Sequence, residues 1–112
     1  MGSQPKTDVL QGTLDLMVLK TLEAMGSQHG YGIAQRVQQV SRDAVQLNQG
    51  SLYPALHRLE QKRWLKSEWR PSETGREAKF YALTRAGEKQ LAIEKETWDR
   101  LTTAVQLIFN VE

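Results

Sequence analysis

Cysteine is absent from this 112-residue chain, and histidine occurs only twice. The missing thiols exclude disulfides and thiolate zinc sites, and two histidines are too few for an ordinary metal-ligand set. The sequence has no phosphate-binding or dinucleotide-binding glycine motif and no paired carboxylates in a plausible pocket, so we expect no enzyme activity, cofactor or metal. It also has no signal-peptide stretch and no run near the ~20 apolar residues of a membrane span, so we expect a cytoplasmic protein without membrane contact.

The charges, in contrast, are plentiful and unevenly spread. Apolar residues make up 39% and charged residues 25% of the chain, which is typical of a single globular domain with one modest core. Residues 1–56 sum to zero, residues 57–83 carry seven basic against four acidic residues and sum to +3, and residues 84–112 sum to −1. On charge alone this run is more often a solvated face than a surface for a polyanion.

Apolar residues at helical spacing predict two helices in the first part of the chain. The first begins at Thr13 and ends before Gly26, where glycine and serine interrupt the pattern. The second follows Gly30 and keeps its apolar side chains on one face up to residues 41–43. Beyond it, Val45–Leu47 alternate over only three residues, which is enough for a brief strand at most.

Proline and glycine, whose backbones differ from those of other residues, lie near two of the predicted helix starts. Pro54 is tolerated in the first turn of a helix, where its missing N–H has no intrahelical partner, so a third helix is predicted to begin near residues 50–51. Gly30 and Gly32 flank Tyr31 at the entrance of the second helix, and we expect them to permit a close approach of other groups and Tyr31 to be structural.

A β-hairpin and a last helix are predicted after the third helix. Leu65–Arg70 and Ala78–Leu83 read as strands joined by a polar, basic loop rich in turn residues. Trp64 and Trp69 are expected to fill the core between the third helix and this hairpin. Thr84 has the hydroxyl that caps the start of a helix, so the last helix should begin directly after it.

Three helices followed by a hairpin is the element order of the winged helix, in which the third helix enters the major groove of DNA and the hairpin, or wing, touches the flanking backbone. We therefore expect a mainly α chain with a small β-hairpin (α+β): a winged helix-turn-helix domain at residues 9–84 and a C-terminal dimerisation helix at residues 85–112. The basic surplus coincides with the third helix and the wing. This agreement favours double-stranded DNA as the partner.

The candidate DNA-binding residues lie on those two elements. Tyr53 is expected to hydrogen-bond phosphate, with packing under the wing as the alternative, and Arg58 to pair with O6 and N7 of guanine unless it is a plain surface charge. Lys79 suits a phosphate, or else pairs with Glu68 across the strands. The full set is Ser51, Tyr53, Pro54, His57, Arg58 and Lys62 on the helix, and Lys66, Arg70, Arg76 and Lys79 on the wing.

The last helix carries an apolar seam at heptad spacing. Its members are Leu91, Trp98 and Val105, with Leu101 and Ile108 between them, as at the a and d positions of a coiled coil. The seam can pack on its own domain or on a second copy, and we expect it to form the interface of a homodimer. Two Trp98 rings facing each other would form a slot for a small aromatic effector, with ordinary seam packing as the alternative.

Four segments resemble the PadR family of bacterial transcriptional repressors: Gln11–Asp15, His29–Ile33, Gly50–Glu60 and Ala78–Gly87. The resemblance covers residues 9–90 in order and in register. It implies a winged helix-turn-helix domain with a C-terminal dimerisation helix, and repression by binding of palindromic operators as dimers. The single last helix is similar to that of short-form members, and effectors of the family include phenolic acids and hydrophobic drugs. A winged-helix module that binds protein instead of DNA is the alternative function.

Overall fold

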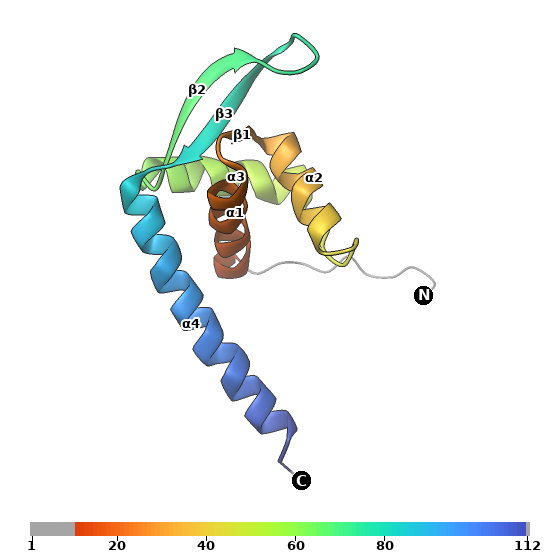
Figure 1. The fold of residues 1–112 in the computed structure, drawn as a ribbon, viewed down its shortest axis with the longest axis vertical. Helices are drawn as coiled ribbons and strands as arrows, with labels where there is room; N and C mark the ends of the chain where they lie inside the picture. The colour runs from red at the N-terminus through yellow and green to blue at the C-terminus, as the bar shows by residue number, and fades with distance from the viewer. Residues whose placement is uncertain (1–10, 112) are drawn as a thin grey trace.

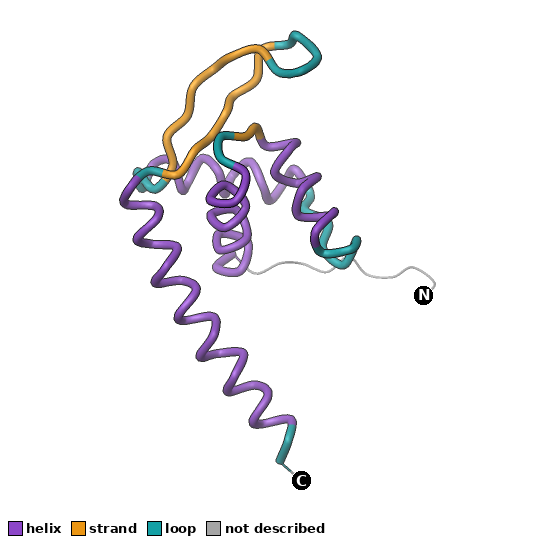
Figure 2. The backbone as a smooth tube through the Cα atoms, viewed as in Figure 1, coloured by secondary structure: helices purple, strands orange, loops and turns teal. Residues whose placement is uncertain are grey.

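The computed structural model describes residues 11–111 as four helices and a three-stranded antiparallel sheet, an α+β fold (Figures 1 and 2). The elements are α1 (Gln11–Met25), β1 (Gln28–His29), α2 (Gly30–Val40), α3 (Gln49–Gln61), β2 (Leu65–Pro71), β3 (Glu77–Leu83) and α4 (Arg85–Phe109). The strands lie in the order β1-β3-β2. The β2–β3 hairpin projects from one end of the helices, and α4 runs away from it toward the other end (Figure 1).

One hydrophobic core joins α1, α2, α3 and the base of the sheet. Leu19, Ile33, Leu56 and Leu59 are fully shielded from solvent, and each such side chain contributes about 1.5–3 kcal/mol by its burial. Helix α1 packs against α2, α3, α4 and β3. It is therefore the element through which the other helices are held in fixed positions.

The sheet has a third strand, so the prediction of an isolated two-stranded hairpin was incomplete. Gln28 pairs with Tyr81, and His29 pairs with Phe80. His29 also caps α2, because its Nδ1 accepts a hydrogen bond from the backbone N–H of Gly32 at 3.1 Å. A two-residue strand is too short to produce an alternating pattern, which explains why periodicity did not reveal it.

Helix α3 begins earlier than predicted. The side chain of Asn48 caps it by accepting a hydrogen bond from the backbone N–H of Ser51 at 2.9 Å, so that Gln49 is the first helical residue. Pro54 consequently lies beyond the first turn and leaves one carbonyl of that turn without its helical donor. The preceding Val45–Leu47 form a loop and not a strand.

Thr84 caps the start of α4 as predicted, and it also joins this helix to the turn that precedes β2. Thr84 Oγ1 accepts a hydrogen bond from the N–H of Gly87 at 3.0 Å and donates one to the carbonyl of Arg63 at 2.7 Å. Gly87 is buried so closely against the backbone of Trp64 that an added Cβ would lie 2.1 Å from the Trp64 carbonyl oxygen. None of the helices within residues 11–111 has both the length and the apolar character needed to cross a membrane.

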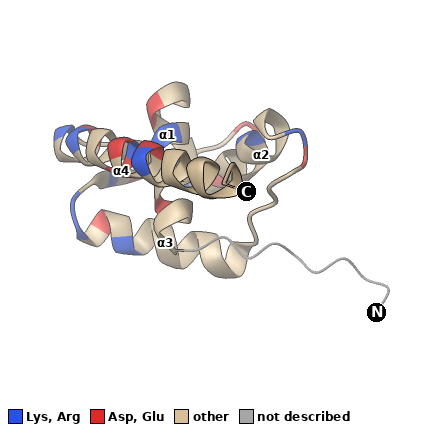
Figure 3. Ribbon diagram, turned by 90° about the horizontal axis from the view of Figure 1, so that it is seen from below, with Lys and Arg blue, Asp and Glu red and all other residues tan. Residues whose placement is uncertain are grey.

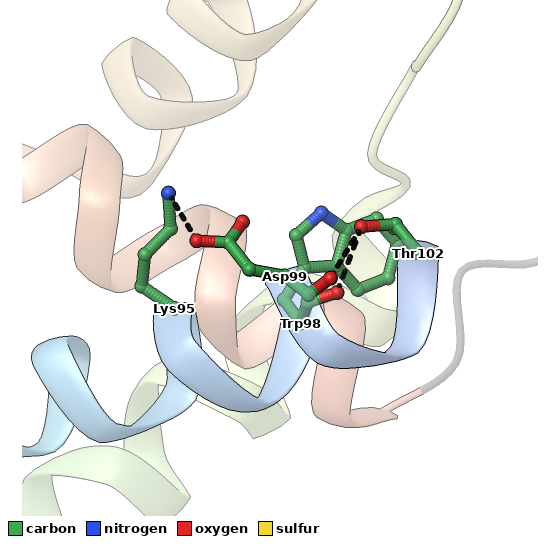
Figure 4. A network of polar contacts seen from close by, with 4 residues as sticks. All are labelled: Lys95, Trp98, Asp99 and Thr102. Atoms are coloured by element: carbon green, nitrogen blue, oxygen red, sulfur yellow. Dashed lines mark hydrogen bonds and ion pairs between the residues drawn. The ribbon is translucent and has the colours of Figure 1, made fainter. Parts of the chain in front are cut away.

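The distal part of α4 extends beyond the other helices (Figure 1). Polar contacts along one side of it include the ion pair between Lys95 and Asp99 at 2.8 Å, and Thr102, whose hydroxyl donates to the carbonyls of Trp98 and Asp99 (Figure 4). After Arg100 the helix has no charged residue. Its end is therefore uncharged, as Figure 3 also shows.

Candidate nucleic-acid interface

Helices α2 and α3 form the helix-turn-helix pair, and β2 with β3 forms the wing. The buried side of α3 consists of Leu52, Ala55, Leu56 and Leu59. Because these residues face the core, the opposite side of the helix faces solvent. Of the predicted DNA-binding residues on α3, those that are exposed are Ser51, Tyr53, Pro54, His57 and Lys62.

The charges of α3 lie toward its C-terminal end (Figure 3), which a short turn connects to β2. Arg58 and Glu60 are the charged residues of the helix, and Lys62 follows directly as its C-cap. The first turns, from Gln49 to His57, present uncharged polar and aromatic side chains. Such groups suit contacts with base edges and single phosphates, whereas the basic residues suit the phosphate backbone.

Arg58 does not face the same surface as its neighbours on α3. Its guanidinium forms an ion pair with Asp15 of α1, with Nη2 at 2.5 Å from the carboxylate. The side chains are only 28% and 10% exposed, respectively. Arg58 Nε is buried without a hydrogen-bond partner among the described residues. This arrangement disfavours the predicted reading of guanine by Arg58, because the guanidinium would first have to leave a buried carboxylate.

Burial has the largest effect on the pKa of Asp15. It raises the pKa of the carboxyl above its ordinary value, and the positive charges of Arg58 and Lys62 only partly oppose that rise. Arg58 is therefore the main group that favours the ionised form of this carboxyl against the effect of burial. The pair connects α1, which packs on α4, to the exposed helix α3, and it acts as a positioning contact for α3.

A second polar cluster fastens the wing to α3. Glu60 accepts a hydrogen bond from Ser67 of β2 at 2.5 Å and pairs with Lys79 of β3 at 3.1 Å. The Ser67 hydrogen bond is the main reason that the pKa of Glu60 is lowered, and the bond to Glu60 raises the pKa of Lys79. The alternative considered for Lys79, a pairing with Glu68, was wrong, because Lys79 lies on the sheet face that packs toward α3 whereas Glu68 lies on the other face.

The remaining basic residues of the wing stand on its outer surface. Lys66 and Arg76 are exposed. Arg70 pairs with Glu68 at 3.0 Å, and its guanidinium lies 4.1 Å from the centre of the Phe80 ring. Exposed pairs of this kind contribute little to stability. These three residues therefore keep their charges available to a ligand.

The two tryptophans of the wing region behave differently. Trp64 is partly buried against the core, as predicted, and the amine of Lys62 lies 4.8 Å from the centre of its ring. The core position expected for Trp69 was wrong, because this residue is 66% exposed. The outer part of the hairpin reaches past the helices (Figure 1), and Trp69 of β2 is exposed to solvent.

An open groove of about 970 Å³ lies between the start of α2 and the wing. At its floor the ring of Tyr53 approaches Gly30 so closely that a Cβ on the glycine would be 2.6 Å from the ring, which confirms the predicted close approach at this glycine. Tyr53 is thus half-packed under the wing and still exposed. Tyr31 also lines the groove and is largely exposed, and its ring stacks at 6.4 Å on that of His29, the cap of α2.

The predicted dimer seam divides into two parts. Leu91 is buried in the core of its own chain, so its assignment to a dimer interface was wrong. The remaining members are exposed: Trp98, Leu101, Val105 and Ile108. Helix α1 packs against α4, and exposure among the described seam residues rises from 6% at Leu91 to 70% at Ile108.

Together, the helix-turn-helix pair, the wing and the capped C-terminal helix define a winged-helix regulator. The sequence profile of the transcriptional regulator PadR-like family matches residues 18–93. The chain belongs to this family, whose members are transcriptional regulators and not enzymes.

Solved structures agree with this assignment. A transcriptional regulator from Clostridium thermocellum is similar at 28% identity and a TM-score of 0.79, over 94% of this chain and 100% of that chain. A Streptococcus transcriptional regulator is 30% identical with a TM-score of 0.76, over 94% and 100%. A PadR family transcription regulator from Clostridium difficile R20291 is 30% identical with a TM-score of 0.72, over 87% and 98%.

Proposed function

We propose that this regulator is a cytoplasmic repressor that binds a palindromic DNA operator as a homodimer. The observation that carries the proposal is that Tyr53, from the exposed side of α3, lines the same groove as Arg76 and Lys79 of the basic wing. A duplex that receives α3 in its major groove brings its flanking phosphates to such a wing.

The contacts divide by chemistry. We assign base and nearby phosphate contacts to the exposed start of α3, and charge contacts with the backbone to the wing. The first set is Ser51, Tyr53, Pro54 and His57, and the second is Lys62, Lys66, Arg70, Arg76 and Lys79. Arg58 takes a positioning role through Asp15. Lys79 adds positive charge while its pairing with Glu60 keeps the wing against α3.

Selection of bound sequences from a pool of random duplex DNA tests the proposal. We expect enrichment of a palindrome, because a symmetric dimer presents two identical α3 helices to two half-sites. Arg76→Ala should weaken binding to all sequences alike and reduce the salt slope, since a phosphate contact carries no sequence information. If no duplex is enriched even at low salt, the chain is a winged-helix module for a protein partner.

The homodimer is proposed from the distal end of α4. Trp98, Leu101, Val105 and Ile108 form an apolar stripe on a helix end without charge, and Ile108 is 70% exposed in the single chain. Monomeric proteins seldom leave such a contiguous stripe in water, and a second copy would bury it in antiparallel or parallel helix packing. The paired Trp98 rings would then offer a flat apolar slot to an aromatic effector.

Sedimentation of variants tests the dimer. Trp98→Ala should weaken dimerisation by up to ~3–5 kcal/mol, the range for truncation of a buried tryptophan. Leu107→Ala is the matched control, because Leu107 is exposed on the same helix but lies two and a half turns from Trp98, at about 3.6 residues per turn, and hence on the opposite face. Equal association of both variants at micromolar concentration would contradict the assignment.

A further inference from the structure

Trp69 is an exposed aromatic residue that neither the core nor the dimer seam explains. It lies in the middle of β2, is 66% exposed, and lines the groove between α2 and the wing. A tryptophan in water on a protruding hairpin adds nothing to the stability of the core. Its exposure therefore suits a contact with a ligand.

The strand register fixes the side of the wing on which Trp69 lies. Trp69 is paired with Lys79, and residues directly opposite each other in an antiparallel pair share a face. Lys79 reaches Glu60 of α3, and so does Ser67, which precedes Trp69 by two residues on the same face. Trp69 thus stands on the face of the wing that is turned toward α3, two residue pairs farther out than Ser67.

The surroundings of Trp69 in the groove are basic and aromatic. Its charged residues are Arg36, Arg70, Arg76 and Lys79 against Glu73 and Glu77, a surplus of two positive charges. Tyr31 and Tyr53 complete the wall opposite the wing. A polyanion with apolar patches matches this lining better than an acidic or a purely apolar protein surface does.

We propose that Trp69 binds the sugar-phosphate backbone of the operator strand that crosses this groove. The inference rests on the proposed DNA binding. A duplex with α3 in its major groove and the wing on its flank must pass one strand between these two elements. The indole offers an apolar face to a deoxyribose and its Nε1–H as a donor to a phosphate oxygen. Trp69 then adds affinity without adding charge.

Substitutions at Trp69 test this contact on the selected operator. Trp69→Ala should weaken binding at least about tenfold, as expected for the loss of one hydrogen bond to a charged phosphate oxygen together with the apolar contact, and Trp69→Phe should recover only the part of that loss that the apolar ring face supplies. The slope of log K against log salt should stay unchanged in both, because no charge is removed. Ile93→Ala is the control, because Ile93 is an exposed apolar residue of α4 that does not line this groove, and it should bind as the wild type does.

Two further readouts separate a contact from a structural role. The indole emission of the wild type should change when operator is added, and this change should be lost in Trp69→Phe. The melting temperature of Trp69→Ala should equal that of the wild type, since the side chain is exposed. The inference is overturned if Trp69→Ala melts at a lower temperature than the wild type and Trp69→Phe still shows the emission change of the wild type when operator is added. Trp69 would then serve the folding of the wing.

These measurements also distinguish a failure of the Trp69 contact from a failure of the proposed DNA binding. If the wild type binds its operator and Trp69→Ala binds equally well, the inference fails and the DNA-binding function stands. If Trp69→Ala alters sedimentation but not the affinity for DNA, Trp69 belongs to a contact between copies and the inference likewise fails. If the wild type binds no duplex, both fail together.

Discussion

Replacing Arg58 by alanine should destabilise the fold much more than removal of a surface arginine does. The change leaves the carboxylate of Asp15, whose side chain is 10% exposed, without its ion-pair partner. Breaking a fully buried pair by removing one member costs about 3–5 kcal/mol. Because Arg58 itself is 28% exposed, we expect a smaller loss, about 2–3 kcal/mol, equivalent to a fall in melting temperature of roughly 10–20 °C for a domain of this size.

The loss should depend on pH in a defined direction. The folded pKa of Asp15 is already raised by burial, and removing Arg58 removes the main opposing cause. A carboxyl whose folded pKa is raised favours folding when protonated, and this contribution disappears as the pH rises through the folded pKa. The destabilisation by Arg58→Ala should therefore be larger at pH 7–8 than near pH 4.

Denaturant unfolding of Arg58→Ala, Asp15→Asn and the double variant, at one protein concentration, measures both effects. Asp15→Asn removes the buried charge, so adding it to Arg58→Ala should recover part of the lost stability. The reasoning is refuted if Arg58→Ala unfolds within about 0.5 kcal/mol of the wild type, the range of ordinary surface changes, and instead loses its preference for one base pair.

Two further predictions concern contacts that attach the wing to α4 and to α3. Gly87→Ala should lower the free energy of unfolding by about 1–3 kcal/mol in thermal unfolding, because its Cβ would collide with the backbone carbonyl of Trp64. Gly12→Ala is the control. Its Cβ would lie in open space on α1, so this change should be neutral or slightly stabilising. The stability difference between wild type and Glu60→Gln should shrink below about pH 4.5, because the pKa of Glu60 is lowered and its stabilising bonds to the wing are lost as it protonates. A difference that stays constant down to pH 3 would show that Glu60 does not hold the wing.

Local signals in the sequence were sufficient for the helices and the hairpin. The cap at Thr84 was found because a hydroxyl before an amphipathic run acts within its own helix turn. The start of α3 was misplaced because Pro54 was given more weight than the capping side chain of Asn48. Strand β1 was missed because its pairing partners, Phe80 and Tyr81, lie about fifty residues away in the sequence.

The site depended more on tertiary contacts. Asp15 and Arg58 are 43 residues apart in the sequence, and the only hint of their pairing was a lone carboxylate within the apolar pattern of the first helix. Trp69 was expected in the core because its strand alternates apolar and polar residues as a half-buried strand does. The side chain is nevertheless exposed, in the outer part of β2. Leu91 follows the heptad seam, but α1 already covers that part of α4.

The central claim, a dimer that holds two α3 helices against one operator, is tested most directly by anisotropy titration of the selected palindrome and of a single half-site at rising salt. We predict that the palindrome binds far more tightly than the half-site, because the second contact is made at high effective concentration. Its affinity should fall about 10³–10⁵-fold between 50 and 200 mM salt if six to ten phosphates are contacted. Equal affinities for palindrome, half-site and unrelated duplex, with no dependence on salt, would contradict the account.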